Sequence, residues 1–303
     1  MRGHPPDFPP KLMSTSPASV SPASAAEYSE RPWPWIRNAI LAGLEQTRPH
    51  ACWGFGEVDV THTLERIQTR QRELRVAVSF PAFIIHAHAH AAAAHPEVLT
   101  YKHGRRLVTF RDSDVLTTIE RNIGGTRVAA AYIVRAAQTK SLAQINWEVR
   151  QAVRTPLPAD PAIGLRRRVA KLPTFVRRLV SWKVRRDPHL VRRLYGTTAV
   201  TILQAPGLRA PFWGLPPLIG SMALGVGSIT DRLALDAQGR PVTRKHLCLS
   251  GVADHAVIDG APLARYAQVL CARLESAEAL EDDAFAAETR ELQAAERAKE
   301  VRR

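Results

Sequence analysis

The fold is decided by the stretch Val252-Ala-Asp-His-Ala-Val-Ile-Asp-Gly-Ala261, which contains a histidine between two regular elements. The short apolar run 246–252 before it predicts a buried strand. Pro262 and the apolar residues spaced along 263–274 predict a helix after it. His255 therefore lies where a strand ends and a helix begins, and an imidazole with an ordinary pKa near ~6.5 can remove a proton at neutral pH.

The residues that follow His255 suit such a junction. Asp259 is expected to fix the loop by capping the helix, and Gly260 is expected to permit a tight turn. The pattern His-x-x-x-Asp-Gly is short enough to occur by chance, in a capped helix with an incidental histidine. The stretches around it decide between the two interpretations.

The rest of the chain alternates strand and helix patterns. This predicts an α/β fold of the two-layer α+β sandwich type, in which helices cover a mixed sheet. Thr61 is expected to cap the second helix. The strands are predicted at 54–60, 107–110, 127–134, 197–203, 218–226 and 246–252, and the helices at 33–44, 61–74, 81–95, from 141 through 149, and to 274 after Gly260.

Several stretches resemble the catalytic domain of dihydrolipoamide acyltransferases, in the chloramphenicol acetyltransferase-like superfamily. The resemblance runs from about Trp53 to Leu274 and includes the His255-x-x-x-Asp259-Gly260 signature. The other matching stretches are Gly56-Glu-Val-Asp-Val-Thr61, Ser79-Phe-Pro-Ala-Phe-Ile-Ile85, Ala94-His-Pro-Glu97, 136–145, Gly196-Thr-Thr-Ala-Val-Thr-Ile202 and the proline-led 216–229.

The resemblance implies a CoA-dependent acyltransferase that moves an acyl group from a CoA thioester to a thiol or hydroxyl acceptor. His255 would be the general base, and Asp259 would hold the active-site loop. Thr201 would donate a hydrogen bond to the tetrahedral oxyanion, with Thr198 as the fallback and simple strand packing as the alternative role. The family also implies a homotrimer with active sites between subunits.

The sequence departs from the family in two ways. No lipoyl domain, lipoylation site or room for a peripheral subunit-binding domain is found before Trp33, so a stand-alone enzyme without its own lipoyl group is expected. Leu99 and Ile202 replace two asparagines of the family, which puts lipoamide as the acceptor in doubt. Coenzyme A is expected as part of the substrate, and no metal is expected.

Composition sets the expected limits of the folded domain. Residues 1–30 are rich in Pro, Ser and Ala and predict a disordered tail. Residues 31–278 are assigned to the acyltransferase catalytic domain, with a basic helical insertion at 161–195. Residues 279–303 mix both charges with Ala at helical spacing and predict a charged C-terminal tail that forms a frayed, solvated helix.

The basic insertion holds most of the chain's formal net charge of +14, because 161–195 contains eleven Lys or Arg and one acid. It interleaves cations with apolar residues, which suits an anionic membrane, an acidic partner such as an acyl carrier protein, or the phosphates of CoA. Packing of its apolar side on its own domain is the alternative. A second possible function is thus a non-catalytic or carrier-protein-dependent relative that docks through this segment. Nucleic acid is disfavoured because no binding motif accompanies the charge.

Two further patterns favour ordinary structural roles. His86, His88, His90 and His95 are expected on a surface helix, and without a nearby carboxylate or Cys they do not complete a zinc site. The three cysteines are scattered, which argues against a disulfide framework. With no secretory signal or membrane span in the pattern, a cytoplasmic protein is expected, with a peripheral membrane location as the variant.

Overall fold

The computed structural model describes residues 50–123, 126–154, 169, 172–203 and 210–301 of the 303-residue chain. The predicted tail at 1–30 and the predicted helix at 33–44 lie outside these residues. No helix in the described ranges is both long enough and apolar enough to cross a membrane.

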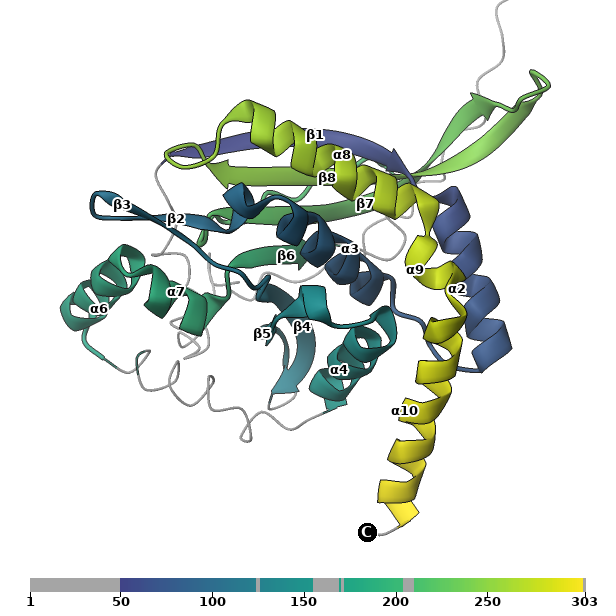
Figure 1. Ribbon diagram of the computed structural model, residues 1–303, viewed down its shortest axis with the longest axis horizontal. Helices are drawn as coiled ribbons and strands as arrows, with labels where there is room; N and C mark the ends of the chain where they lie inside the picture. The colour runs from purple at the N-terminus through teal and green to yellow at the C-terminus, as the bar shows by residue number, and fades with distance from the viewer. Residues whose placement is uncertain (1–49, 124–125, 155–168, 170–171, 204–209, 302–303) are drawn as a thin grey trace, which may run out of the picture. The chain divides into compact units, whose positions relative to one another are not determined.

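A six-stranded mixed sheet forms the centre of the described fold (Figure 1). Its strands lie in the order β1-β8-β7-β6-β4-β5; β6 runs parallel to both neighbours, and the other pairs are antiparallel. This mixed sheet under helices confirms the predicted fold class. The strands are β1 Ala51–Asp59, β4 Val115–Ile123, β5 Thr126–Val134, β6 Thr198–Ile202, β7 Met222–Leu235 and β8 Pro241–Asp254.

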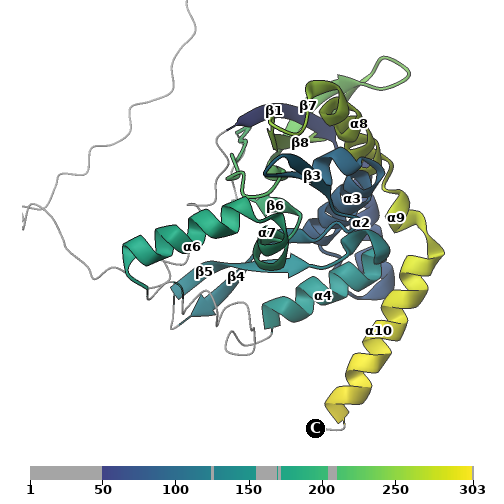
Figure 2. The ribbon, with the colours of Figure 1, turned by 60° about the vertical axis from the view of Figure 1, so that its left-hand side comes forward.

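Helices cover one face of this sheet (Figures 1 and 2). Their apolar stripes, such as Leu270 and Leu274 on α8, meet the strand residues in one continuous core. The covering helices are α2 Thr61–Leu74, α3 Phe80–Ala94, α4 Leu142–Arg154 and α8 Gly260–Ser276, with the short 3₁₀ turns η1 Pro96–Leu99 and η2 Ala137–Thr139.

On strand β7, the segment 212–216 lies directly against two glycines. A side chain at Gly225 would overlap the carbonyl oxygen of Gly214, and one at Gly227 would overlap that of Phe212. Hydrogen bonds hold the segment there: the Phe212 N–H donates to Ser228 Oγ at 2.9 Å, and the Ser228 N–H donates back at 3.0 Å. The glycines of the Gly-Val-Gly stretch thus allow a close approach of backbone to backbone.

The N-terminus of α2 differs from the prediction. The N-cap position is Val60, and Thr61 is the first helical residue. Asp59 supplies the side chain instead: its Oδ1 accepts hydrogen bonds from the Thr61 N–H at 2.9 Å and from the Thr61 hydroxyl at 2.5 Å. Asp59, two residues before the start of the helix, thus supplies the capping hydrogen bond that was expected from Thr61.

Helix α3 is buried, which corrects its assignment to the surface. Residues Ala82 to Ala89 all have low solvent exposure, and His88 is fully buried. The His88 Nδ1 lies 2.6 Å from the Tyr266 hydroxyl, and its Nε2 lies 2.9 Å from the Thr198 hydroxyl. Since Thr198 donates its own proton to the Met222 carbonyl, His88 donates from Nε2 and accepts at Nδ1. One neutral imidazole therefore joins α3, α8 and β6.

The described part of the predicted basic insertion forms two helices, α6 Thr174–Arg186 and α7 Pro188–Tyr195. Asp187 caps α7 through its side chain, which accepts from the His189 and Leu190 N–H groups. Val184 and Val191 pack in a second small core with Tyr101 and the hairpin β2 Thr100–His103 and β3 Arg106–Thr109. Part of the insertion's apolar side thus packs on its own domain.

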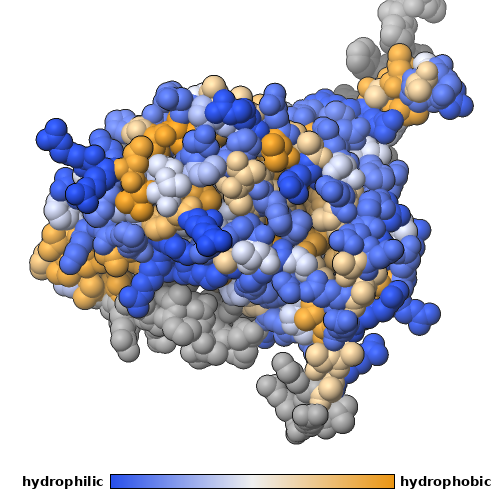
Figure 3. All heavy atoms as spheres, viewed as in Figure 1, coloured by the Kyte–Doolittle hydropathy of each residue, from blue (hydrophilic) through white to orange (hydrophobic). Residues whose placement is uncertain are grey.

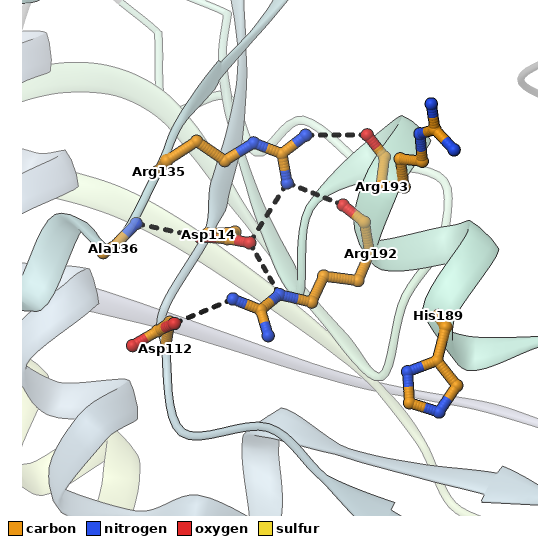
Figure 4. Close-up of a pocket in the computed structure, with 7 residues that line it drawn as sticks. All are labelled: Asp112, Asp114, Arg135, Ala136, His189, Arg192 and Arg193. Atoms are coloured by element: carbon orange, nitrogen blue, oxygen red, sulfur yellow. Dashed lines mark hydrogen bonds and ion pairs between the residues drawn. The ribbon is translucent and has the colours of Figure 1, made fainter.

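Asp114 is the polar anchor that fixes the start of β6 (Figure 4). Its Oδ2 accepts hydrogen bonds from Arg192 at 2.9 Å and Arg135 at 3.1 Å, and its Oδ1 accepts from the Ala136 N–H at 2.8 Å. Its backbone carbonyl accepts from the Thr197 N–H at 2.8 Å. The hydrogen bond to Asp114 raises the pKa of Arg192. This anchor holds β6 against β4.

The C-terminal segment is helical where the structure describes it, as predicted, but part of it is buried, which corrects the predicted solvated tail at 279–303. It forms α9 Glu278–Glu281 and α10 Asp283–Val301. Leu280, Phe285 and Ala286 are buried in the main core. Glu296 accepts hydrogen bonds from Gln151 and Arg154 on α4. These contacts attach α10 to the domain.

The buried imidazoles predict a loss of stability in acid. Burial lowers the pKa of His88 and that of His86 from 6.5 to about 3. Between these two pH values the unfolded chain binds protons at both histidines, and the folded chain does not. Stability is fully present above pH 6.5 and falls as the pH drops towards 3, by about 1.4 kcal/mol per pH unit for each such histidine.

We therefore expect His88→Gln to lower the stability at neutral pH and to flatten this dependence by about 1.4 kcal/mol per pH unit. Urea unfolding at a series of pH values measures both effects. His103→Gln, on an exposed hairpin position, is the matched control and should keep the wild-type slope. An unchanged slope in His88→Gln would contradict the assignment.

Candidate active site

His255 lies in the turn between β8 and α8, as predicted, and its backbone is held at two points. The Asp254 N–H donates to the Ser221 carbonyl, and the His255 N–H donates to the His50 carbonyl, at 2.9 and 2.8 Å. The His255 side chain is 57% exposed. The loop thus holds the backbone firmly while the ring faces outwards.

Asp254 fixes the shape of this loop. Its Oδ1 accepts a hydrogen bond from the Ala256 N–H at 3.1 Å, and its carbonyl accepts from the Val257 and Ile258 N–H groups. Ile258 is buried in the core and anchors the far side of the turn. The sequence signal for this role was an aspartate two residues before the bonded N–H, the spacing of an Asx turn.

Asp259 has a different position from the one expected of a helix cap. It occupies the N-cap position of α8, but its side chain makes no capping hydrogen bond. Instead its Oδ1 lies 3.8 Å from the Nδ1 of His255, with 85% of the side chain exposed. Gly260 also differs from the prediction, because its φ lies outside the left-handed region and no turn there requires glycine.

Thr201 lies on β6 and is partly exposed. Among the described residues its hydroxyl has no hydrogen-bond partner, so it is available to donate. Gly225 is its neighbour on β7, and Ser250 is the next residue across on β8. His255 follows Asp254, which lies four residues beyond Ser250 along β8.

Within one chain Thr201 and His255 do not meet. At about 3.3 Å per residue, those four residues of strand separate them by about 13 Å, and two strand spacings add about 10 Å across the sheet. The structure thus places both predicted residues at the protein surface, at different ends of the strands.

Thr198 fits the fallback role poorly. The register places it closer to the His255 end of the sheet, since Met222 pairs with Ala253 and is the neighbour that accepts from Thr198. However, Thr198 is buried, and its hydroxyl already donates to Met222 and accepts from His88. A hydroxyl with both functions satisfied cannot also stabilise an oxyanion.

A separate cavity lies beside α7, which contributes His189, Arg192 and Arg193 to its lining (Figure 4). It has a volume of about 370 Å³ and is lined by Asp112, Asp114, Arg135 and Arg192, among others. The two carboxylates already pair with the two guanidinium groups, at 2.8 to 3.1 Å. This cavity belongs to the structural anchor of β6.

The histidines of α3 form no metal centre within the described chain. The rings of His86 and His90 lie 4.3 Å apart, and burial with the nearby His90 lowers the pKa of His86. No group of three or more His, Cys, Asp or Glu side chains in the described residues is arranged to hold a metal ion. The three cysteines, Cys52, Cys248 and Cys271, are free thiols.

A family model matches one segment in the second half of the chain. Residues 219–281 match the family model described as the catalytic domain of 2-oxoacid dehydrogenases acyltransferase. This segment includes all of β7 and β8, the His255 loop and helix α8. No curated protein sequence matches the chain.

Solved structures match over most of the chain. A probable dihydrolipoamide acetyltransferase from Listeria monocytogenes is 20% identical, with a TM-score of 0.58, over 84% of this chain and 97% of that one. The dihydrolipoamide acetyltransferase of Azotobacter vinelandii is 17% identical, with a TM-score of 0.60, over 87% and 99%. The cubic core of a pyruvate dehydrogenase multienzyme complex is 17% identical, with a TM-score of 0.59, over 87% of this chain and 99% of that one. The resemblance predicted from the sequence is confirmed: the chain has the fold of these dihydrolipoamide acetyltransferase structures, and residues 219–281 match the 2-oxoacid dehydrogenase acyltransferase family model.

Proposed function

We propose that this protein is a CoA-dependent acyltransferase that moves an acyl group from a CoA thioester to a thiol or hydroxyl acceptor, with His255 as general base. The observation that carries the proposal is the loop of His255, in which the N–H groups of Asp254 and His255 are both hydrogen-bonded to distant carbonyls while the imidazole faces outwards. The loop also lies within the segment that matches the acyltransferase family.

The proposed reaction uses one proton transfer and one acyl transfer. A nitrogen of His255 takes the proton from the acceptor, whose sulfur or oxygen attacks the thioester carbonyl. The carbon–sulfur bond to CoA then breaks, and the departing thiolate takes the proton back from the imidazolium. Asp259, at 3.8 Å from Nδ1, favours a proton on that nitrogen, which leaves Nε2 as the base.

Thr201 is the proposed hydrogen-bond donor to the oxyanion. In the Azotobacter enzyme a serine, a histidine and an asparagine have been studied for their role in the catalytic mechanism; the serine precedes the histidine by 52 residues, and the asparagine follows it by four. Here Thr201 precedes His255 by 54 residues, and Asp259 follows it by four. The two spacings support the same assignment in this chain.

The distance between Thr201 and His255 leads us to place the complete site between subunits. In the homotrimer that the family resemblance implies, one subunit would supply His255 and the adjacent subunit would supply Thr201. Exposed apolar residues on β1 and the segment over β7 offer a surface for such an assembly: Trp53, Phe55, Phe212 and Leu215 have 38%, 59%, 42% and 59% exposure.

Removal of the proposed base should separate binding from chemistry. We expect His255→Ala to lower turnover by about 10²–10⁴-fold, because the acceptor loses its general base, and to leave micromolar binding of CoA unchanged. Calorimetric titration with CoA and acetyl-CoA, together with CoA release in a screen of thiol and alcohol acceptors, measures the two effects. His103→Ala is the exposed control. Failure of both forms to bind CoA would overturn the CoA-dependent function.

The hydroxyl of Thr201 is tested by two substitutions. Thr201→Val keeps the shape of the strand residue and removes the donor, so we expect turnover to fall by about 10²–10³-fold with little change in KM. Thr201→Ser keeps the donor and should stay close to wild type. Thr118→Val, at an exposed position of β4, is the matched control. Equal activity of Thr201→Val and wild type would exclude the role.

A site between subunits can be tested by mixing two inactive proteins. His255→Ala and Thr201→Val subunits, co-expressed with different tags and purified together, form mixed assemblies. In a random cyclic mixture about one interface in four carries both wild-type groups, so we expect about that fraction of wild-type turnover. If both residues act within one chain, the mixture stays as inactive as its components.

A further inference from the structure

Helix α6 has apolar residues on two opposite faces. One face packs inwards through Ser181 and Val184, towards α7 and the β2–β3 hairpin. The other face is exposed: Phe175, Leu179 and Trp182 are 75%, 64% and 46% accessible to solvent. A soluble helix normally places polar residues on its outward face, so this second apolar face needs an explanation.

The exposed residues form a continuous stripe, which we call the α6 ridge: Leu172, Phe175, Leu179 and Trp182. The spacing of Phe175, Leu179 and Trp182, four and three residues, places their side chains in one row along the helix, and Leu172 lies two residues before the helix begins. Figure 3 shows hydrophobic atoms gathered at the edge of the molecule where Figure 1 shows α6. In Figure 2 this helix projects from the edge of the fold.

Cations line both sides of the α6 ridge. At 100° per residue, Arg178 and Arg185 fall on one side of the stripe and Lys183 on the other. Arg186 stacks on the Trp182 ring, with its guanidinium carbon 4.2 Å from the ring centre. Helix α6 contains no acidic residue. The outward face thus combines an apolar row with two positive edges.

We propose that α6 is a membrane-docking helix, which lies on an anionic phospholipid surface with the α6 ridge in the interfacial region and its flanking cations at the phosphates. Phe, Leu and Trp on one row with Arg and Lys beside it is the arrangement by which helices lie in a bilayer interface. The charge disfavours two copies of this face against each other, because the like-charged edges would repel. The ridge projects outwards, and a deformable lipid surface can enclose it without a preformed groove.

The test is flotation of the full-length protein with lipid vesicles. Wild type should float with vesicles of phosphatidylcholine mixed with phosphatidylglycerol, and should bind poorly to phosphatidylcholine alone. The triple variant Phe175→Ser, Leu179→Ser, Trp182→Ser should lose at least about tenfold in partitioning, and so should Arg178→Glu with Lys183→Glu. Added salt should weaken the binding, since exposed charges are screened.

Matched controls distinguish binding through this surface from non-specific adsorption of the protein to vesicles. Leu233→Ser with Leu235→Ser removes two exposed apolar residues from the β7–β8 hairpin, and Arg72→Glu with Arg290→Glu makes the same charge change elsewhere. Both, and His255→Ala, should float like wild type. Absence of flotation, or equal flotation of all variants, would overturn the proposal. A change of oligomeric state in the ridge variants would also overturn it, in favour of a second copy of the chain.

Discussion

The described fold depends on a close approach of two backbones at Gly225 and Gly227 of β7. Because neither residue has a side chain, the segment 212–216 can lie directly on the strand and bury its second face. Both faces of this central strand are therefore covered, one by helices and one by chain backbone. The buried Ser250 donates a hydrogen bond to the Gly214 carbonyl of that segment, and the buried Ser228 donates one to the carbonyl of Ala210, which lies just before it.

The same approach explains the apolar surface beside β1. A segment that lies flat on a sheet directs some of its side chains outwards, and Phe212 and Leu215 are exposed for this reason. Trp213 turns back, and its Nε1–H donates to the Gly56 carbonyl at 3.2 Å. The fold of one chain thus leaves an apolar area next to Phe55, and an assembly of chains would cover it.

The sequence predicted the elements whose apolar residues repeat at a regular spacing. It missed those whose burial depends on contacts with distant segments of the chain. Strand β5, helices α2 and α4 and the end of β8 were found because their apolar residues repeat at regular spacing. Strand β4 was missed because Thr117, Thr118 and Glu120 interrupt its pattern; Thr117 is buried by its neighbours. The C-terminal helices were expected to be solvated because large apolar residues such as Leu280 and Phe285 are rare among the charged residues of this segment. Both residues are nevertheless buried in the core.

The candidate site shows the same division. The position of His255 followed from local signals, a strand run before it and a helix pattern after it. The groups that hold it, the carbonyls of His50 and Ser221, come from distant segments and cannot be found by spacing along the chain. The side chain of Asp259 turned towards His255 and made no cap, because a backbone suitable for capping does not fix the rotamer.

The buried imidazole of His88 has a consequence for how the enzyme's kinetics can be interpreted. A framework histidine that titrated near neutrality would distort β6 and α8 in the same pH range in which a catalytic base works, and the two effects would be mixed in every rate profile. Because burial lowers the pKa of His88 to about 3, the imidazole that joins α3, α8 and β6 stays neutral throughout that range. A single inflection in turnover near neutral pH would therefore report the surface chemistry and not a change in the fold beneath it.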